Sequence, residues 1–284
     1  MPDPSAPVAG GVDALAGELS LAADLARRAG AIQMERYERL ERIVHKSERD
    51  VVTEVDELCE RLILEGIRAA HPDDAILAEE SGAHVSHRGR GRAPGAGAER
   101  VWIVDPLDGT VNYANGIPLF CVSIALVVRG QPYIGVVYDP VRDELFSGLV
   151  GGGARLDGLP IHHPAKDDLR DCVVSLALPY RGWRRRDRSI RRRVRVTRDI
   201  GSAALSLAYV ANGRFDAFIQ GRGLSLWDVA AAGLVCAEAG ATVTNVSGGP
   251  WLDLALAPRS VVVVAAAPAH HATLLELLAA TTTA

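Results

Sequence analysis

The most informative chemistry in this sequence comes from two carboxylates that stand three residues apart. The segment DPLDGT at 105–110 follows an apolar run at 101–104, which predicts a short buried strand ending at the first acid. Carboxylates this close repel one another unless a cation lies between them, and all-oxygen ligands favour Mg²⁺ or Mn²⁺ over zinc. If a helix begins at Gly109 and Thr110, its free amides face the same space and could bind phosphate. The segment predicts a metal and phosphate site on a strand-to-helix turn, with a capped turn carrying solvated acids as the alternative.

Two further acidic segments could complete a metal cage. Glu79 and Glu80 follow a predicted strand at 75–78, and Asp228 begins a predicted helix at 227–239. Each has an ordinary interpretation by itself, since a Glu-Glu pair after a strand is usually solvated and an Asp at a helix start is usually a cap. Three strand or helix ends that all present acids nevertheless favour one shared site.

The remaining elements must bring these acids together. Apolar side chains recur at spacings of three and four from Leu15 to Ala29 and from Val55 to Ala70, which predicts two amphipathic helices. Further helices are expected near 202–212, with Ser202 as N-cap, and near 227–239 and 268–280. Strands are expected near 75–78, 101–104, 120–129, 132–138, 144–149, 172–178, 215–219, 242–246 and 260–266. Turn residues between the strands from 120 to 149 indicate antiparallel hairpins, and the Gly- and Arg-rich stretch at 83–99 indicates a surface loop.

The composition is that of an ordinary globular protein. Of the 284 residues, 48% are hydrophobic and 23% are charged, with a net charge of −4, which argues against disorder and against a global attraction to nucleic acid or anionic lipid. The four cysteines form no CxxC pair, which indicates free thiols in a reducing cytosol. No apolar run approaches the ~20 residues of a membrane span. We expect a flexible tail without a secretory signal at 1–10 and one domain at 11–284, in a cytoplasmic protein.

Four motifs in order resemble the inositol monophosphatase family of magnesium-dependent, lithium-sensitive sugar phosphatases. The first is DPLDGT with its continuation VNY at 111–113, and the second is WDVAAAG at 227–233, continued by EAG at 238–240. The third spans Lys46 to Asp56, and the fourth is the EES segment that begins at Glu79. The resemblance covers nearly the whole chain, from the first expected helix to the last.

The resemblance implies a set of metal ligands. A first Mg²⁺ would be held by Glu79, Asp105 and the Leu107 carbonyl. A second would be held by Asp105, Asp108 and Asp228. Two or three Mg²⁺ ions per active site are implied, with Mn²⁺ as a substitute.

The resemblance also implies roles in binding and catalysis. The amides of Gly109 and Thr110 would bind the phosphate. The Thr110 hydroxyl, oriented by Asp56, would help to activate the attacking water, and Glu79 could also steer that water. The implied substrate contacts are Ser202, Ala203 and Asp228.

The fold implied by the resemblance is an α+β, layered α-β-α-β-α arrangement with an antiparallel N-terminal sheet and a mixed C-terminal sheet, usually in a homodimer. The implied activity is Mg²⁺-dependent hydrolysis of inositol 1-phosphate or a similar small polyol or sugar phosphate. Neither a membrane nor nucleic acid is expected as a partner. Alternatives are another phosphatase of the family, acting on fructose 1,6-bisphosphate, histidinol phosphate or NADP, or an RNA- or protein-binding regulator on the same scaffold.

Two features depart from the family pattern. In members that hydrolyse inositol phosphates, a glutamate commonly stands six places before the tryptophan of the second motif, whereas this chain has Gly221. The physiological substrate therefore stays open. Ten arginines lie between 181 and 198, where they could bind RNA or another anionic partner, recruit a multiply phosphorylated substrate or form a solvated face. The histidine pairs at 162–163 and 270–271 lie outside the motifs, and we expect them at the surface.

Overall fold

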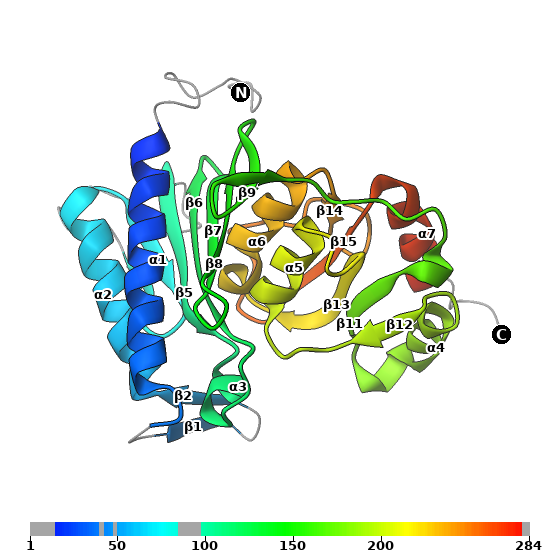
Figure 1. Cartoon of the computed structure of the whole chain (residues 1–284), viewed down its shortest axis with the longest axis horizontal. Helices are drawn as coiled ribbons and strands as arrows, with labels where there is room; N and C mark the ends of the chain where they lie inside the picture. The colour runs from blue at the N-terminus through cyan, green and yellow to red at the C-terminus, as the bar shows by residue number, and fades with distance from the viewer. Residues whose placement is uncertain (1–14, 40–42, 48–49, 85–97, 280–284) are drawn as a thin grey trace.

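Five alternating layers build the fold. The computed structural model describes residues 15–39, 43–47, 50–84 and 98–279, so the expected tail at 1–10, the side chain of Lys46 and most of the expected loop at 83–99 lie outside the description. Figure 1 shows helices on the outer face of a large sheet, between this sheet and a second one, and beyond the second sheet. In that order they are α1 (Ala16–Arg36) and α2 (Glu54–Ala70), α5 (Ala203–Ala211) and α6 (Leu226–Glu238), and α4 (Tyr180–Arg191) and α7 (Pro268–Ala279). This is the α-β-α-β-α arrangement of the α+β class that the resemblance implied.

Within the described residues, the large sheet has eight strands in the order β10-β9-β8-β7-β6-β5-β3-β4. Their bounds are β3 (Ala75–Ala78), β4 (Gly82–His84), β5 (Arg100–Asp108), β6 (Cys121–Val128), β7 (Gln131–Asp139), β8 (Glu144–Leu149), β9 (Gly153–Leu156) and β10 (Leu159–Ile161). The second sheet has five described strands, β12 (Val196–Arg198), β11 (Val173–Ala177), β13 (Ala217–Leu224), β15 (Val261–Ala266) and β14 (Thr242–Thr244). The hairpin of β1 (Ile43–Ser47) and β2 (Asp50–Thr53) precedes α2, and the short helix α3 (Thr110–Ala114) follows β5.

One strand pair corrects the expectation of an antiparallel N-terminal sheet. The hairpins from β6 to β8 are antiparallel as predicted, and β5 pairs antiparallel with β6, but β3 and β5 run parallel, with Ala75 opposite Val101 and Ala78 opposite Val104. Parallel strands end at the same edge of a sheet, so the acids that follow each strand are brought side by side. This pair therefore matters more for the site than the antiparallel hairpins do.

Close packing of α6 on the large sheet fixes the position of this helix relative to the strands. The layer between the sheets is apolar, and α6 lies against β7 so closely that a Cβ on Gly135 would come within 2.3 Å of the Ala231 carbonyl oxygen. Only glycine permits this approach. On the other face of the sheet, α1 and α2 pack on side chains that include the fully buried Trp102.

The sequence patterns missed several elements and misplaced one histidine pair. The short strands β1, β2, β4, β9, β10 and β12 were not predicted, and neither was α4 in the arginine-rich stretch. β4 contains the first two residues of the stretch at 83–99, where a loop was expected. The expectation that His270 and His271 lie at the surface is wrong, because both are buried where α7 packs on the second sheet. His270 Nε2 lies 2.6 Å from the Lys166 carbonyl oxygen, and His271 Nε2 lies 3.0 Å from the Thr244 hydroxyl.

Candidate active site

A bulge in β5 turns two acids toward the same space. Asp105 stands opposite Ser123 of β6, and Asp108 stands opposite Cys121. Between these two pairs β5 advances by three residues while β6 advances by two, so β5 contains one extra residue. Side chains alternate between faces along a regular strand, and residues three apart would point in opposite directions. The extra residue reverses this alternation, which is why both carboxylates reach one side. The strand thus continues through Asp108, where a strand-to-helix turn had been expected.

The bulge is fastened on both sides. The Leu107 amide donates to Asp105 Oδ1 at 3.0 Å, and Gln33 Nε2 from the buried face of α1 donates to the Pro106 carbonyl at 2.8 Å. Proline suits this position because a bulge needs no ladder donor there. Gln33 lies in none of the sequence motifs, so sequence reasoning missed this contact.

Glu79 reaches the same edge from β3. Its amide donates to the Val104 carbonyl at 3.2 Å, which continues the parallel pairing with β5. The following turn is held by Glu60 of α2, whose carboxylate accepts from the Glu80 amide at 2.8 Å and from the Ser81 amide at 3.0 Å. Glu60 is therefore a positioning group that the motifs did not indicate.

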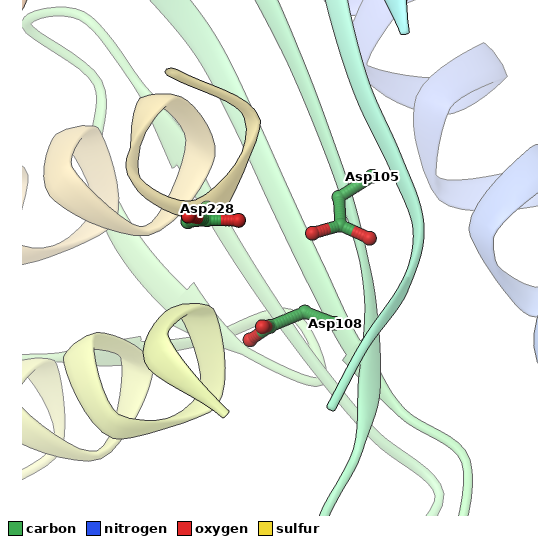
Figure 2. A group of neighbouring side chains, drawn as sticks. All are labelled: Asp105, Asp108 and Asp228. Atoms are coloured by element: carbon green, nitrogen blue, oxygen red, sulfur yellow. The ribbon is translucent and has the colours of Figure 1, made fainter. Parts of the chain in front are cut away.

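Asp228 arrives from the opposite side of the cavity, at the start of α6. It forms a capping box with Ser225, whose amide donates to Asp228 Oδ2 at 2.6 Å. Figure 2 shows its carboxylate pointing toward those of Asp105 and Asp108. One oxygen from each of the three acids lies within 4.8 Å of the others. The helix cap and the cluster thus use the same side chain.

The mutual repulsion of these acids raises the pKa values of their carboxyl groups. Burial first, and then Glu79, Asp108 and Asp228, raise the pKa of Asp105 well above its ordinary value. Burial and Asp108 raise the pKa of Asp228 from 3.8 to about 8, although the Ser225 amide and Arg259 favour its charged form. Burial also raises the pKa of Asp108 against opposing hydrogen bonds from Ser202 and the following amides. Such a cluster needs positive charge to hold several acids ionised.

The donor set fits hard divalent cations. Carboxylate oxygens gathered within a few ångströms, with a backbone carbonyl at Leu107 beside them in the cavity lining, are the ligands that Mg²⁺ and Mn²⁺ prefer. No cysteine or histidine joins the described cluster, which argues against a zinc site.

A hydroxyl stands beside the cluster. Thr110 Oγ1 lies 3.0 Å from Asp56 Oδ1, to which it donates, and 2.9 Å from the Leu107 carbonyl. The other Asp56 oxygen accepts from the Thr53 amide at 2.8 Å and from its hydroxyl at 2.6 Å, within the capping box of α2. Gly109, with φ of 100°, lies in the left-handed region and turns the chain from β5 into α3.

The four acids Glu79, Asp105, Asp108 and Asp228 line a cavity of about 220 Å³, whereas Asp56 does not appear in its lining. Its lining also includes Gly109, Thr110, Gly201, Ser225, Trp227 and Arg259. Of the expected substrate contacts, Asp228 lines the cavity, whereas Ser202 and Ala203 do not appear in its lining. The Ser202 hydroxyl instead donates to Asp108 Oδ2 at 2.6 Å, and the Ala204 amide donates to the same oxygen at 2.7 Å. Asp108 is thereby held by the start of α5, and its other oxygen is left for the cluster.

Arg259 and Gly201 also line the cavity. Gly201 begins the GSAA segment at 201–204, which resembles a substrate-lining segment of the family, whereas Arg259 carried no sequence signal. Arg259 lies outside every motif, and its backbone joins the cavity wall: its amide donates to the Ser225 hydroxyl at 3.0 Å, and its carbonyl accepts from the Gly223 amide at 3.3 Å. Gly201 precedes the residue that was predicted as the N-cap of α5. Among the described residues, no helix is both long and apolar enough to span a membrane.

Comparisons with known proteins agree with this geometry. Residues 17–283 match the model of the inositol monophosphatase family. The chain is 38% identical over 239 residues to a protein named Nus factor SuhB from Pasteurella multocida, covering 81% of this chain and 86% of the relative. It is 37% identical over 241 residues to inositol monophosphatase 1 of Solanum lycopersicum, covering 82% and 86%.

Solved structures share the whole fold. The extragenic suppressor protein suhB from Bartonella henselae has a TM-score of 0.84 and 32% identity, covering 94% of this chain and 100% of that one. Inositol monophosphatase from Anabaena (Nostoc) sp. PCC 7120 has a TM-score of 0.80 and 33% identity, covering 95% and 98%. Because several relatives are named Nus factor, the expectation that nucleic acid is not a partner has no support.

Proposed function

Since the chain belongs to the inositol monophosphatase family, we propose that it is a metal-dependent phosphomonoesterase that acts on inositol 1-phosphate or a similar small polyol or sugar phosphate. The observation that carries the proposal is the meeting of Asp105, Asp108 and Asp228 within 4.8 Å, in a cavity that also contains Glu79 and Thr110. Three separate parts of the chain contribute these groups. A site of this kind suits an anionic ester that approaches bound cations.

The proposed ligand sets follow the arrangement of the acids. Glu79, Asp105 and the Leu107 carbonyl would hold one Mg²⁺, and Asp105, Asp108 and Asp228 a second, with a third ion or Mn²⁺ as variants. When bound, such ions lower the pKa of the attacking water and neutralise the developing charge on the leaving oxygen.

The chain's own groups have complementary tasks in this proposal. The Thr110 hydroxyl orients the attacking water, and Asp56 fixes that hydroxyl through the 3.0 Å hydrogen bond. The amides of Gly109 and Thr110 bind the phosphate oxygens, and Glu79 helps to steer the water and to hold its proton. Ser202 and Ala203 support the substrate side by positioning Asp108.

A phosphate-release screen over small phosphate esters, with and without Mg²⁺, tests this function. We expect Mg²⁺-dependent release, inhibition by lithium, and loss of activity in Asp108→Asn with an unchanged circular dichroism spectrum. Asp168→Asn is the matched control, because Asp168 is an exposed N-cap of the short helix Leu169–Asp171 and does not line the cavity. Wild-type turnover by Asp108→Asn would show that the metal assignment is wrong.

A second candidate function is favoured by α4. A groove of about 670 Å³ along this helix is lined by Leu178, Pro179, Asp187 and four arginines, namely Arg184, Arg188, Arg191 and Arg192. Asp187 pairs with Arg191, but no described acid forms an ion pair with Arg188 or Arg192. Together with the Nus factor name of several relatives, this supports an RNA-binding regulator on the same scaffold.

Charge reversal separates the two candidates. Arg188→Glu with Arg192→Glu should weaken RNA binding at least tenfold at fixed salt if the groove binds RNA, without changing turnover of a small monophosphate. Arg61→Glu with Arg155→Glu, two exposed arginines elsewhere, is the control. RNA binding that is absent or insensitive to the α4 pair would remove this candidate. We further propose that the protein is cytoplasmic and forms a homodimer. Light scattering of the purified protein would test the oligomeric state.

A further inference from the structure

Glu79 differs from the three clustered aspartates in that it lies on a hairpin loop. Ala78 of β3 stands opposite Gly82 of β4, so the residues at 79–81 form a three-residue loop. Gly82 closes this loop with a φ of 77°, in the left-handed region that glycine adopts readily. Glu79 lines the cavity from this loop. Its position therefore depends on the groups that fix the loop.

A chain of three side chains holds the loop from outside the cavity. Glu60 of α2 accepts from the amides of Glu80 and Ser81 at 2.8 and 3.0 Å. The Ser81 hydroxyl also donates to Glu60 Oε1, and the same hydroxyl oxygen lies 2.6 Å from His84 Nε2 in β4. The described lining of the cavity includes none of Glu60, Ser81 and His84. These contacts connect α2, the loop and β4 without entering the site.

The supply of hydrogens fixes the direction of each bond in this chain. A carboxylate offers only acceptors, so Ser81 gives its single hydroxyl hydrogen to the buried Glu60. The Ser81 oxygen can then only accept, and the His84 Nε2–H group must donate to it. The imidazole can donate from Nε2 in its neutral form and in its protonated form. His84 is therefore a hydrogen-bond donor to the loop at any pH.

The surroundings of His84 favour a neutral imidazole. Burial, followed by Arg68, lowers the pKa of His84 below its usual value of 6.5, against the opposing effect of Glu60. His84 and Ser81 line a second cavity of about 410 Å³ between α2 and the hairpin. The charged residues that line it are Glu57, Glu60, Arg61, Glu65, Arg68 and Glu80. At neutral pH, His84 thus contributes a hydrogen bond to the loop rather than a positive charge.

We propose that His84 is a positioning residue of the site, because its donor fixes the loop that presents Glu79 to a divalent ion. It acts through Ser81, which Glu60 holds from the other side. This inference rests on the proposed function and concerns only the ion that Glu79 would hold. The acids proposed for the second ion come from β5 and α6, and none of them lies on the loop. Loss of the His84 donor should therefore weaken one metal site and spare the other.

Titration of the purified full chain with Mn²⁺, with free Mn²⁺ measured by electron paramagnetic resonance, tests this without an activity assay. His84→Ala should weaken one class of Mn²⁺ sites by roughly 3- to 10-fold and leave the other class unchanged. The Mg²⁺ concentration for half-maximal phosphate release should rise by the same factor, with kcat at saturating Mg²⁺ unchanged. His84→Gln should keep wild-type binding, because its amide can replace the Nε2–H donor. His162→Ala, at an exposed histidine, is the matched control.

A double-mutant cycle shows whether His84 acts through Ser81. Once Ser81→Ala has removed the acceptor, His84→Ala should cause no further loss of Mn²⁺ affinity, whereas additive losses would overturn the proposal.

Three other results would overturn it: unchanged Mn²⁺ binding in His84→Ala, equal weakening of both classes of sites, or a loss in His84→Gln as large as that in His84→Ala. Thermal unfolding in EDTA checks each variant, and a loss of affinity that only follows a lowered Tm counts against the proposal as well. In all these cases Mg²⁺-dependent phosphate release by the wild type would leave the phosphatase intact. A wild-type protein that neither binds Mn²⁺ nor releases phosphate would refute both.

Discussion

Replacing Asp228 with asparagine distinguishes a metal ligand from an ordinary helix cap. Asparagine keeps an oxygen that can accept the Ser225 amide, now 2.6 Å from Asp228 Oδ2, so the capping contact survives while the negative charge is lost. If Asp228 is only a cap, Asp228→Asn should destabilise the protein by about 0.5–1 kcal/mol through the lost charge–dipole interaction, at every pH from 5 to 8. It should also leave any response to Mg²⁺ unchanged.

The clustered site predicts the opposite sign in the absence of divalent ions. Burial and Asp108 raise the pKa of Asp228 from 3.8 to about 8, so between these values the folded chain binds a proton that the unfolded chain has released. A raised pKa in the folded state means that the group's stability contribution is full below pH 3.8 and is lost as the pH rises through 8. From pH 5 to pH 8 the loss is about 1.4 kcal/mol for each unit, or about 4 kcal/mol in all.

The asparagine variant escapes this loss. Metal-free Asp228→Asn should therefore gain on the wild type by about 4 kcal/mol between pH 5 and pH 8, which is roughly 8–16 °C in Tm for a chain of this size. Removing the charge of Asp228 also reduces the repulsion on Asp105, which further stabilises the variant relative to the wild type. Adding millimolar MgCl₂ at pH 8 should raise the Tm of the wild type more than that of the variant, because ligands that bind only the folded state stabilise it.

Thermal unfolding in EDTA at pH 5, 6, 7 and 8, repeated with MgCl₂, measures both effects. Asp168→Asn is the control, since Asp168 caps a short helix and is exposed. A metal-free Asp228→Asn protein that is less stable than the wild type at pH 8, with an undiminished Mg²⁺ response, would refute the cluster as an electrostatic unit and leave the cap as the whole role of Asp228.

Other substitutions probe the supporting groups. Thr110→Val should lower kcat at least 100-fold with little change in KM or circular dichroism, because the hydroxyl held by Asp56 acts on the attacking water; activity kinetics that show a KM effect alone would contradict this role, and Thr110→Ser should retain activity. Glu60→Gln should raise the Mg²⁺ concentration for half-maximal activity by roughly 10–100-fold, since Glu60 holds the Glu80–Ser81 turn; an unchanged titration would remove Glu60 from the site. Gly109→Ala should destabilise the fold by about 1–3 kcal/mol in urea unfolding, because φ is 100° and the new Cβ would lie 2.8 Å from a backbone carbonyl oxygen; a neutral result would show that this turn can relax.

The local patterns predicted the long helices and strands because each carries its own periodicity, whereas the layered fold was implied by the family resemblance. The stripes of α1 and α2 and the hairpins of β6 to β8 are confirmed by the structure. The parallel pairing of β3 and β5 was not predicted, since a strand's residues look the same in either direction and pairing is settled by the chain between them. The short strands β2, β4, β9, β10 and β12 were also missed, because strands of three or four residues carry too few alternations to stand out.

In the site, too, the residues within motifs were predicted, and the contacts between residues far apart in the chain were not. Sequence spacing pointed to Asp105, Asp108 and Asp228, and the structure brings their carboxylates together, while their roles remain predictions. Spacing could not have shown that a one-residue bulge aims Asp105 and Asp108 to one side, nor that Glu60 and Arg259 stand nearby. Those contacts join residues that are far apart in the chain and belong to no motif. The three-dimensional packing alone supplies them.

Two of the acids near the cavity owe their placement to the same local device. Asp56 and Asp228 each stand at the third residue of a helix, and each returns one oxygen to the N-cap backbone in a capping box. A capping box fixes the carboxylate without a distant partner, so the second oxygen is already oriented when the helix forms. For Asp56 that oxygen accepts from Thr110, and for Asp228 it faces the cluster. Such an aspartate can therefore be a helix cap and a functional acid of the site at the same time, because the capping box orients its free oxygen. A test of function must keep the capping contact while it removes the negative charge.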